Sequence, residues 1–371
     1  MNDKQSYERY QRQLILPGFG EAAQQKLLEA KVLIIGAGGL GCPVLQYVAA
    51  AGVGTIGIVD DDVVQLNNLQ RQVLFTVDDI GHSKGEKAAA VLQKLNPDCR
   101  VLAFNQRVFT KNALQLFREY DVIIDATDNF PTRYLINDAC YLLKKPLVYG
   151  SISRFEGQVA VFNNQSAKDV NYRDIFPAPP KDGEVMNCAE AGVLGVLGGI
   201  IGSMMANETI KLITGIGNPL VNRLYTYHAL KNQVYEISLA ISAEGRALLP
   251  RSESDFMKMD YVQICSPVSS ISEIDAQQFD EWIGNASATI IDVREMQELP
   301  EVVEFIHTRI PLWVLADRTG DIKSDTVITF CQTGKRSLHA AGTLQNIFGD
   351  TKKVYSLRGG ILQWKKQHQP V

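Results

Sequence analysis

The stretch from Lys31 to Asp62 constrains the fold of this chain most. It reads as a short apolar strand, a glycine turn, an apolar helix and a second strand. The glycines of the turn are Gly36, Gly38, Gly39 and Gly41. Glycines let a backbone turn sharply and approach a phosphate, which the amides and the dipole of the following helix then hold. The stretch therefore predicts a nucleotide-binding unit of the Rossmann-like α/β type.

Two aspartates end the second strand of this unit. At the positions of Asp60 and Asp62, a carboxylate can accept hydrogen bonds from ribose hydroxyls. The glycine pattern alone fits a nicotinamide dinucleotide as well as ATP. An NAD-dependent Rossmann oxidoreductase is therefore the first alternative.

Charged residues at later strand ends favour ATP. Arg71 and Lys84 follow the second strand, and Asp128 follows a strand predicted at 121–124. A triphosphate needs more positive charge than a dinucleotide pyrophosphate, and a carboxylate can hold Mg²⁺ on the phosphates. Each of these residues alone would more often be an ordinary solvated charge. Together they predict a site for ATP and Mg²⁺.

The rest of the chain continues the alternation of strands and helices, which predicts a mostly parallel sheet. The chain around 242–260 is polar and lacks periodicity, and a second, smaller α/β pattern follows it. We expect an ATP-binding domain over 1–245, a linker over 246–265 and a second α/β domain over 266–371.

Two cysteines are candidates for sulfur chemistry. The run T-V-I-T-F-C-Q-T-G-K-R-S brings Cys331 from a strand to a short loop before a helix. Loop amides, Lys335 and Arg336 would stabilise an anionic sulfur there. Cys188 precedes a predicted helix, where a thiolate is also favoured; a partly buried inert thiol is an equal alternative.

Six short motifs occur in order: R-Y-x-R-Q, G-A-G-G-L-G, D-D-D-x-V, N-L-Q-R-Q, G-x-x-K and A-T-D-N. With them, residues 1–240 resemble the MoeB, ThiF and HesA adenylyltransferases of the ubiquitin-activating-enzyme-like superfamily. The cysteine loop, with I-I-D-V-R-E before it and L-R-G-G-I-L-Q-W after it, resembles a rhodanese domain over about 266–371. The resemblance implies a Rossmann-like mixed, mostly parallel sheet domain plus a smaller α/β rhodanese-like domain.

The resemblance also implies a role for individual residues of the first domain. Arg12 would reach into the partner subunit's site of a homodimer as an arginine finger. Asp128 would carry the magnesium ion. ATP and its metal would lie against Gly39, Gly41, Asp60, Asp62, Asn68, Arg71, Lys84, Asp128 and Asn129.

The implied substrate is a ubiquitin-like sulfur-carrier protein with a C-terminal Gly-Gly. Its carboxylate would attack the α-phosphate of ATP, pyrophosphate would leave and an acyl-adenylate would remain. A persulfide on Cys331, loaded by a cysteine desulfurase, would then give a thiocarboxylate for molybdopterin or thiamine biosynthesis, with Cys188 as a candidate relay. A non-catalytic scaffold that binds a carrier is the second alternative.

The sequence departs from the family at two places. A structural zinc ion in the family is held by two C-x-x-C pairs. The first position reads N-Y-R-D at 171–174, and only Cys265 lies in the second region, at 251–265. Structural zinc needs four N or S ligands, so we predict none. The H-x-P-G-A segment of rhodaneses is degenerate at 307–311, which leaves an inactive docking domain as an alternative.

Charge and cysteine content limit the partners and the compartment. The formal net charge is −4 and the six cysteines are scattered. Surfaces that bind nucleic acids or membranes are usually basic, so we expect neither partner. The polar N-terminus is unlike a signal peptide, and the cysteine usage fits a reducing compartment. We therefore expect a cytoplasmic protein.

Overall fold

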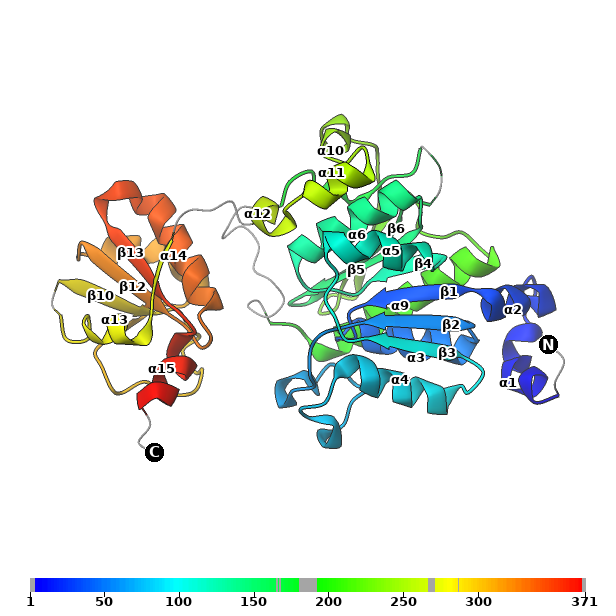
Figure 1. The fold of residues 1–371 in the computed structure, drawn as a ribbon, viewed down its shortest axis with the longest axis horizontal. Helices are drawn as coiled ribbons and strands as arrows, with labels where there is room; N and C mark the ends of the chain where they lie inside the picture. The colour runs from blue at the N-terminus through cyan, green and yellow to red at the C-terminus, as the bar shows by residue number, and fades with distance from the viewer. Residues whose placement is uncertain are drawn as a thin grey trace. The chain divides into compact units, whose positions relative to one another are not determined.

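The computed structural model describes residues 4–164, 166, 168–179, 192–265, 271–285 and 287–368. The described residues form two compact units (Figure 1). Residues 4–179 and 192–264 make the first unit, and residues 265–368 make the second. Each unit has its own sheet and its own hydrophobic core.

The first unit is built on an eight-stranded sheet with the order β3-β2-β1-β4-β5-β6-β7-β8. Strands β1 to β5 are paired in parallel, and β5 to β8 are paired antiparallel. Their bounds are Lys31–Ile35, Thr55–Val59, Arg100–Phe104, Val122–Asp125, Leu147–Ser153, Glu156–Phe162, Arg223–His228 and Gln233–Ser238, in order from β1 to β8.

Two layers of helices cover the parallel half of this sheet. Val32 and Ile34 of β1 are fully buried in one core cluster with residues of α3, α4 and α9. They lie on the same face of the sheet because alternate residues of a strand point to the same side. Helices α5 and α6 pack against each other on the opposite face (Figure 1). The helices are α1 Lys4–Leu14, α2 Gly20–Glu29, α3 Gly41–Ala51, α4 Lys84–Leu95, α5 Thr110–Arg118, α6 Phe130–Leu143, α7 Tyr172–Ile175, α9 Gly195–Thr214, α10 Ala243–Ala247, α11 Glu253–Lys258 and α12 Tyr261–Cys265.

Among the described residues, α9 is the one helix long and apolar enough to cross a membrane by length and composition. It packs against α3, β5 and β6, and Leu197, Ile201 and Met205 are buried there. Its composition is that of a core helix.

Residues 246–265, which the sequence suggests as a linker, carry short helices that pack on the first unit. Arg246 lies 3.1 Å from the carboxylate of Asp174, Phe256 is fully buried, and Tyr261 is 4% exposed. These helices are too short to show a periodic pattern, and tertiary contacts hold them in place.

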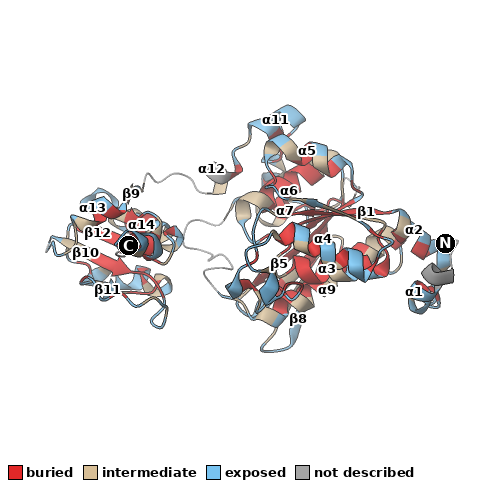
Figure 2. Ribbon diagram, turned by 60° about the horizontal axis from the view of Figure 1, so that its bottom comes forward, coloured by how far each residue is buried: buried red, intermediate tan, exposed pale blue. Residues whose placement is uncertain are grey.

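The second unit is a five-stranded parallel sheet with the order β11-β10-β12-β13-β9. Its core includes Phe279, Phe330 and Trp364, and buried residues follow its strands and helices (Figure 2). The predicted fold class is confirmed for both units. The elements are β9 Ser272–Ile274, α13 Ala276–Asp280, β10 Ala288–Asp292, β11 Thr308–Arg309, β12 Thr326–Phe330, α14 Lys335–Phe348, β13 Lys353–Leu357 and α15 Gly360–His368.

Candidate active sites

The first candidate site lies where β1 passes into α3. Gly36 has a φ of +97°, and a Cβ there would lie 2.8 Å from the backbone oxygen of Ala126. A Cβ on Gly41 would lie 1.9 Å from the backbone oxygen of Gly36. Only glycine fits at either position, so residues 36–41 form a tight turn beside the end of β4, which we call the glycine loop. The loop leads into the amino end of α3, which favours anions.

Helix α9 packs so closely on the glycine loop that no side chain fits between them at Gly198. A Cβ on Gly198 would lie 2.7 Å from the backbone oxygen of Gly39. The glycine-rich composition of α9 indicates close packing, but the sequence does not say that the packing partner is this loop.

Asp60 and Asp62 follow β2 beside the glycine loop. The Asp60 carboxylate accepts hydrogen bonds from the backbone N–H groups of Ala37, at 2.7 Å, and of Asp62, at 2.8 Å. Burial raises the pKa of Asp60, and these hydrogen bonds oppose the shift. Asp60 therefore shapes the loop, whereas the side chain of Asp62 is 65% exposed and open to a ligand.

Lys84 brings a buried cation to the same edge of the sheet. Its Nζ lies 3.0 Å from Oδ2 of Asp62, and the residue is 5% exposed. Ser83 caps α4 by accepting the backbone N–H of Glu86, so the start of the helix fixes the lysine.

Arg71 lies over the glycine loop, whereas Asn68 makes a local contact. A Cβ on Gly39 would lie 3.5 Å from the Arg71 side chain. Asn68 is buried, and its Oδ1 accepts the backbone N–H of Gln65 at 3.2 Å, which caps the short turn over residues 66–68. Arg71 therefore lies at the predicted site, whereas the side-chain oxygen of Asn68 stabilises the turn.

Gln72 is a candidate site residue that the sequence analysis missed. It is 4% exposed, and its Nε2 lies 3.7 Å from the position of a Cβ on Gly38. Its Oε1 has no hydrogen-bond partner among the described residues. An unpaired buried acceptor costs about 1–3 kcal/mol, so Gln72 is suited to accept a hydrogen bond from a ligand at the loop. In the sequence, Gln72 is marked only by its place as the last residue of the N-L-Q-R-Q motif.

Asp128 and Asn129 lie after β4. Asp128 is exposed, whereas Asn129 caps α6 by accepting a backbone N–H of its first turn at 3.0 Å. Behind them Arg133 donates to the backbone oxygen of Thr127 at 2.8 Å and faces Asp125. Burial raises the pKa of Asp125, and the charge of Arg133 opposes the shift. The carboxylate of Asp128 is thus exposed just beyond β4, next to a buried charged pair.

Arg12 lies away from the glycine loop of its own chain. It is an exposed residue of α1, and the neighbouring Gln13 donates to the backbone oxygen of Ala51, the last residue of α3. Helix α3 begins at the glycine loop and its 11 residues span about 16 Å. The structure therefore does not bring Arg12 into the site of its own subunit.

The second candidate site is the loop after β12. Cys331 is 1% exposed, and its Sγ accepts the backbone N–H of Gly334 at 3.2 Å. Gly334 has a φ of +92°, and a Cβ there would lie 2.8 Å from the backbone N of Gly359. The backbone N–H of Ile361 donates to the Cys331 oxygen at 2.8 Å. The start of α15 thus fixes this cysteine loop. Cys188 lies outside the described residues.

A buried carboxylate lies at the end of β10, beside the strand that leads to Cys331. Asp292 accepts hydrogen bonds from Arg294, at 2.9 and 2.8 Å, and from Arg309, at 2.9 and 2.7 Å. Burial acts to raise the pKa of Asp292, but these hydrogen bonds outweigh it and the pKa is lowered.

Residues 171–174, where the resemblance would place a cysteine pair, join a buried charged cluster. Arg173 donates to both carboxylate oxygens of Asp138, at 2.8 and 2.7 Å, and Tyr261 donates to the same carboxylate at 2.9 Å. In the part of the chain that the structure describes, no three His, Cys, Asp or Glu side chains gather as a metal site. That the protein holds no structural zinc stays a prediction.

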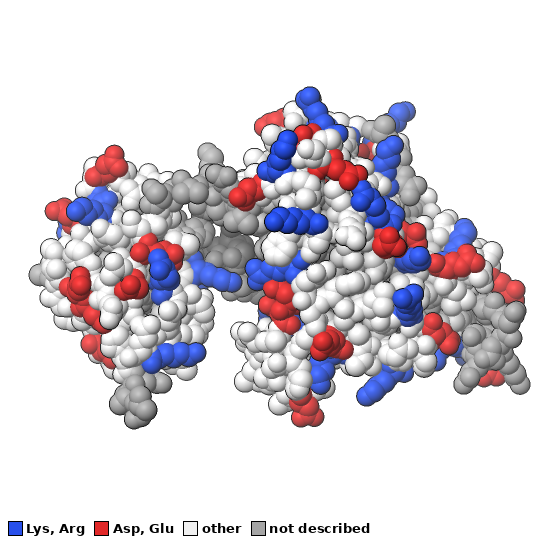
Figure 3. All heavy atoms as spheres, in the orientation of Figure 1, with Lys and Arg blue, Asp and Glu red and all other residues white. Residues whose placement is uncertain are grey.

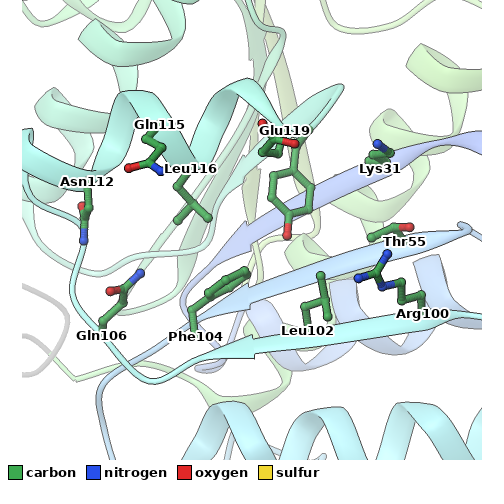
Figure 4. Close-up of a pocket in the computed structure, with 11 residues that line it drawn as sticks. Lys31, Thr55, Arg100, Leu102, Phe104, Gln106, Asn112, Gln115, Leu116 and Glu119 are labelled. Carbon is green, nitrogen blue, oxygen red and sulfur yellow. The ribbon is translucent and has the colours of Figure 1, made fainter.

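A cavity of about 480 Å³ lies along β3 and α5 (Figure 4). Lys31, Thr55 and Arg100, the first residues of three parallel strands, line one end of it. None of its lining residues is among those described above at the two candidate sites.

The sequence pattern of the ThiF family matches residues 10–245, and that of the Rhodanese-like domain matches residues 275–367. The chain belongs to the ThiF family. The predicted resemblance, an adenylyltransferase of this type fused to a rhodanese domain, is confirmed.

This ThiF family protein is 42% identical to Probable adenylyltransferase/sulfurtransferase MoeZ of Mycobacterium tuberculosis, over 99% of this chain and 95% of MoeZ. It is 36% identical to Adenylyltransferase and sulfurtransferase MOCS3 of Xenopus laevis, over 98% of this chain and 87% of that protein. It is 52% identical to the Sulfur carrier protein adenylyltransferase of Thermus thermophilus, over 62% of this chain and 85% of that protein.

A solved structure of E. coli MccB matches with a TM-score of 0.57 at 22% identity, over 65% of this chain and 74% of that one. This likeness supports the fold alone. The relatives by sequence establish that the ThiF family protein is an enzyme of the adenylyltransferase and sulfurtransferase class.

Proposed function

We propose that this enzyme adenylates the C-terminal Gly-Gly of a ubiquitin-like sulfur-carrier protein with ATP and then converts it to a thiocarboxylate. The proposal rests on one combination: a glycine loop beside Arg71 and the Lys84–Asp62 pair, and a cysteine loop at Cys331, in a single chain. The names of the relatives support it, since one is a sulfur carrier protein adenylyltransferase and others join both activities.

The residues of the first site fit ATP with Mg²⁺. The glycine loop leaves no room for a Cβ at its tightest points, and the amino end of α3, Arg71 and Lys84 can offset the charge of the phosphates. Asp128 and Asp62, which are exposed beyond β4 and β2 of the same sheet, offer the oxygen ligands that Mg²⁺ prefers. When bound, the metal ion would neutralise phosphate charge.

Adenylation needs no nucleophile from the protein. A carboxylate oxygen of the carrier attacks the α-phosphorus, the bond to the bridging oxygen breaks and pyrophosphate leaves with its electron pair. Positioning and charge neutralisation by the site residues supply the catalysis. Gln72 is suited to bind a donor group of either substrate.

Sulfur transfer follows from a persulfide on Cys331, which a cysteine desulfurase would load. The terminal sulfur attacks the acyl carbon and AMP leaves, so that an acyl disulfide joins the carrier to Cys331. A second thiolate, for which we propose Cys188, then attacks Sγ of Cys331. The thiocarboxylate leaves, and a cellular dithiol reduces the protein disulfide that remains.

We further propose that the enzyme works as a cytoplasmic homodimer in molybdopterin or thiamine biosynthesis. The position of Arg12, away from its own glycine loop, supports a role for this residue at the partner subunit's site. On the face seen in Figure 3, basic and acidic side chains are interspersed, which is in keeping with a protein rather than a nucleic-acid partner.

Carrier-dependent exchange between ATP and labelled pyrophosphate tests the first step. We expect exchange only when Mg²⁺ and a carrier ending in Gly-Gly are both present, and a carrier without its last glycine is the matched control. Failure with every carrier that copurifies with the enzyme would contradict adenylation. Uptake of NADH in place of ATP would favour an oxidoreductase, and carrier binding without use of ATP would favour a scaffold.

Mass spectrometry of the copurified carrier tests the second step and identifies the pathway. We expect a carrier in which one sulfur replaces one oxygen at the C-terminus. A carrier that never gains sulfur, although exchange occurs, would restrict the enzyme to adenylation.

A further inference from the structure

A glutamate pairs with Arg336, one of the two cations that follow the cysteine loop. Glu298 places both carboxylate oxygens on Arg336: Oε2 accepts from Nη1 at 2.7 Å, and Oε1 accepts from Nη2. The two side chains are 20% and 18% exposed, so water screens the pair only in part. Arg336 is the second residue of α14, directly beyond the loop that begins at Cys331.

The segment that carries Glu298 also holds the loop at a second point. Gln332 donates from Nε2 to the backbone oxygen of Leu299 at 3.2 Å. We call residues 295–305 the strap. The strap is fixed at its other end, since Lys365 of α15 donates to Glu304 at 2.6 Å and to the backbone oxygen of Glu301 at 2.8 Å. Glu298 is therefore held in place against the loop.

We propose that Glu298 is a specificity-determining residue of the sulfurtransferase site, which excludes small anionic sulfur donors by occupying the guanidinium of Arg336. A guanidinium binds carboxylate and sulfur oxyanions through the same forked geometry. A small dianion must therefore displace Glu298 or bind beside its negative charge, and either route weakens binding. The proposal rests on the proposed function only in naming Cys331 as the sulfur acceptor.

Thiosulfate is the probe for this exclusion. The Cys331 thiolate attacks the outer sulfur of thiosulfate, the S–S bond breaks and sulfite leaves with its electron pair. Cyanide then takes the outer sulfur from the Cys331 persulfide as thiocyanate and returns the thiolate. Turnover of both substrates is thus balanced without another reagent.

Two matched variants of the full-length enzyme test the role of the Glu298 carboxylate. Glu298→Gln and Glu301→Gln each remove one negative charge from the strap, but it is Glu298 that bonds to Arg336 through its carboxylate. We expect Glu298→Gln to lower the KM for thiosulfate about tenfold, as expected for one charge-assisted contact, with kcat little changed. Glu301→Gln should leave the KM within about twofold. An unchanged KM in Glu298→Gln, or an equal fall in both variants, would overturn the proposal.

Alkylation of Cys331 tests the proposal without any sulfur transfer. Iodoacetate is an anion and iodoacetamide is its neutral counterpart, so the ratio of their rates at Cys331, read by peptide mass spectrometry, reports the local charge. We expect this ratio to rise about tenfold in Glu298→Gln and to stay unchanged in Glu301→Gln. An unchanged ratio in Glu298→Gln counts against the role of Glu298 even if thiosulfate is never turned over. A raised ratio without thiosulfate turnover supports the charge-selecting role of Glu298, whereas the proposed sulfur transfer from a desulfurase is tested by the mass of the copurified carrier.

Discussion

Among the single residues of the first site, Lys84 has a buried cation, whereas its partner Asp62 is exposed. We expect Lys84→Met to lower kcat/KM for ATP–pyrophosphate exchange about 100-fold, since the substitution keeps the buried stem and removes the charge. The free energy of unfolding should change little, because water can solvate the exposed Asp62. Lys87→Met removes a cation from the same helix and is the control. Exchange within threefold of the wild-type rate, roughly the scatter of a neutral substitution, would remove Lys84 from the mechanism.

Asp292 provides a pH signature for the second unit. Burial acts to raise its pKa from the ordinary 3.8, but the hydrogen bonds from Arg294 and Arg309 bring the folded value below it. The stabilisation is therefore fully present above pH 3.8 and is lost as the pH falls through the lower folded value. The three tryptophans of the chain, Trp282, Trp313 and Trp364, all lie in this unit, so their fluorescence follows its unfolding specifically.

We expect Asp292→Asn to lower the free energy of unfolding at neutral pH by about 3 kcal/mol, because the buried guanidinium of Arg294 and the partly buried one of Arg309 lose their counter-charge. The difference from wild type should narrow below pH 3.8 in urea titrations followed by tryptophan fluorescence. The exposed Asp325→Asn is the matched control. A difference that stays constant as the pH falls would show that the pKa of Asp292 is not lowered.

At the scale of the element, the close approach of α9 to the glycine loop sets a packing limit that two neighbouring glycines can test. A Cβ on Gly198 would lie 2.7 Å from the Gly39 oxygen, whereas a Cβ on Gly199 has nothing within 4 Å. We expect Gly198→Ala to displace the helix, to destabilise the first unit by about 1–3 kcal/mol and to reduce exchange at least tenfold. Gly199→Ala should be neutral or slightly stabilising, because alanine favours a helix. Equal melting temperatures and exchange rates for the two variants would contradict this packing.

Elements with a strong pattern were predictable from the sequence, and those held by tertiary contacts were not. The apolar run from Val32 to Ile35 becomes β1, which begins one residue earlier at Lys31, and the run at 55–59 becomes β2. The short helices of 246–265 could not be predicted, because they depend on contacts with distant parts of the chain. The hydroxyl of Tyr261, for example, donates to Asp138, 123 positions earlier. Likewise, N-L-Q-R-Q reveals a functional segment, but only the fold shows that Asn68 caps a turn while Gln72 faces the loop.

At the scale of the whole molecule, the position of Arg12 makes a prediction about subunit cooperation. If Arg12 serves the partner subunit's site, then Arg12→Ala and Lys84→Met should each be inactive alone. When the two variants exchange subunits, each mixed dimer holds one site with Lys84 from one chain and Arg12 from the other. About a quarter of the wild-type exchange rate should return, since half of the dimers are mixed. If mixing restores nothing, Arg12 acts within its own chain or has no role in exchange.

The burial of Cys331 has a consequence for how long a loaded enzyme lasts. With 1% of the residue exposed, glutathione and peroxide in bulk water meet its sulfur only when the loop opens. A persulfide formed on Cys331 would thus be reduced more slowly by cellular thiols than a persulfide on an exposed cysteine. The rhodanese-like domain would then retain the transferable sulfur until an adenylated carrier binds.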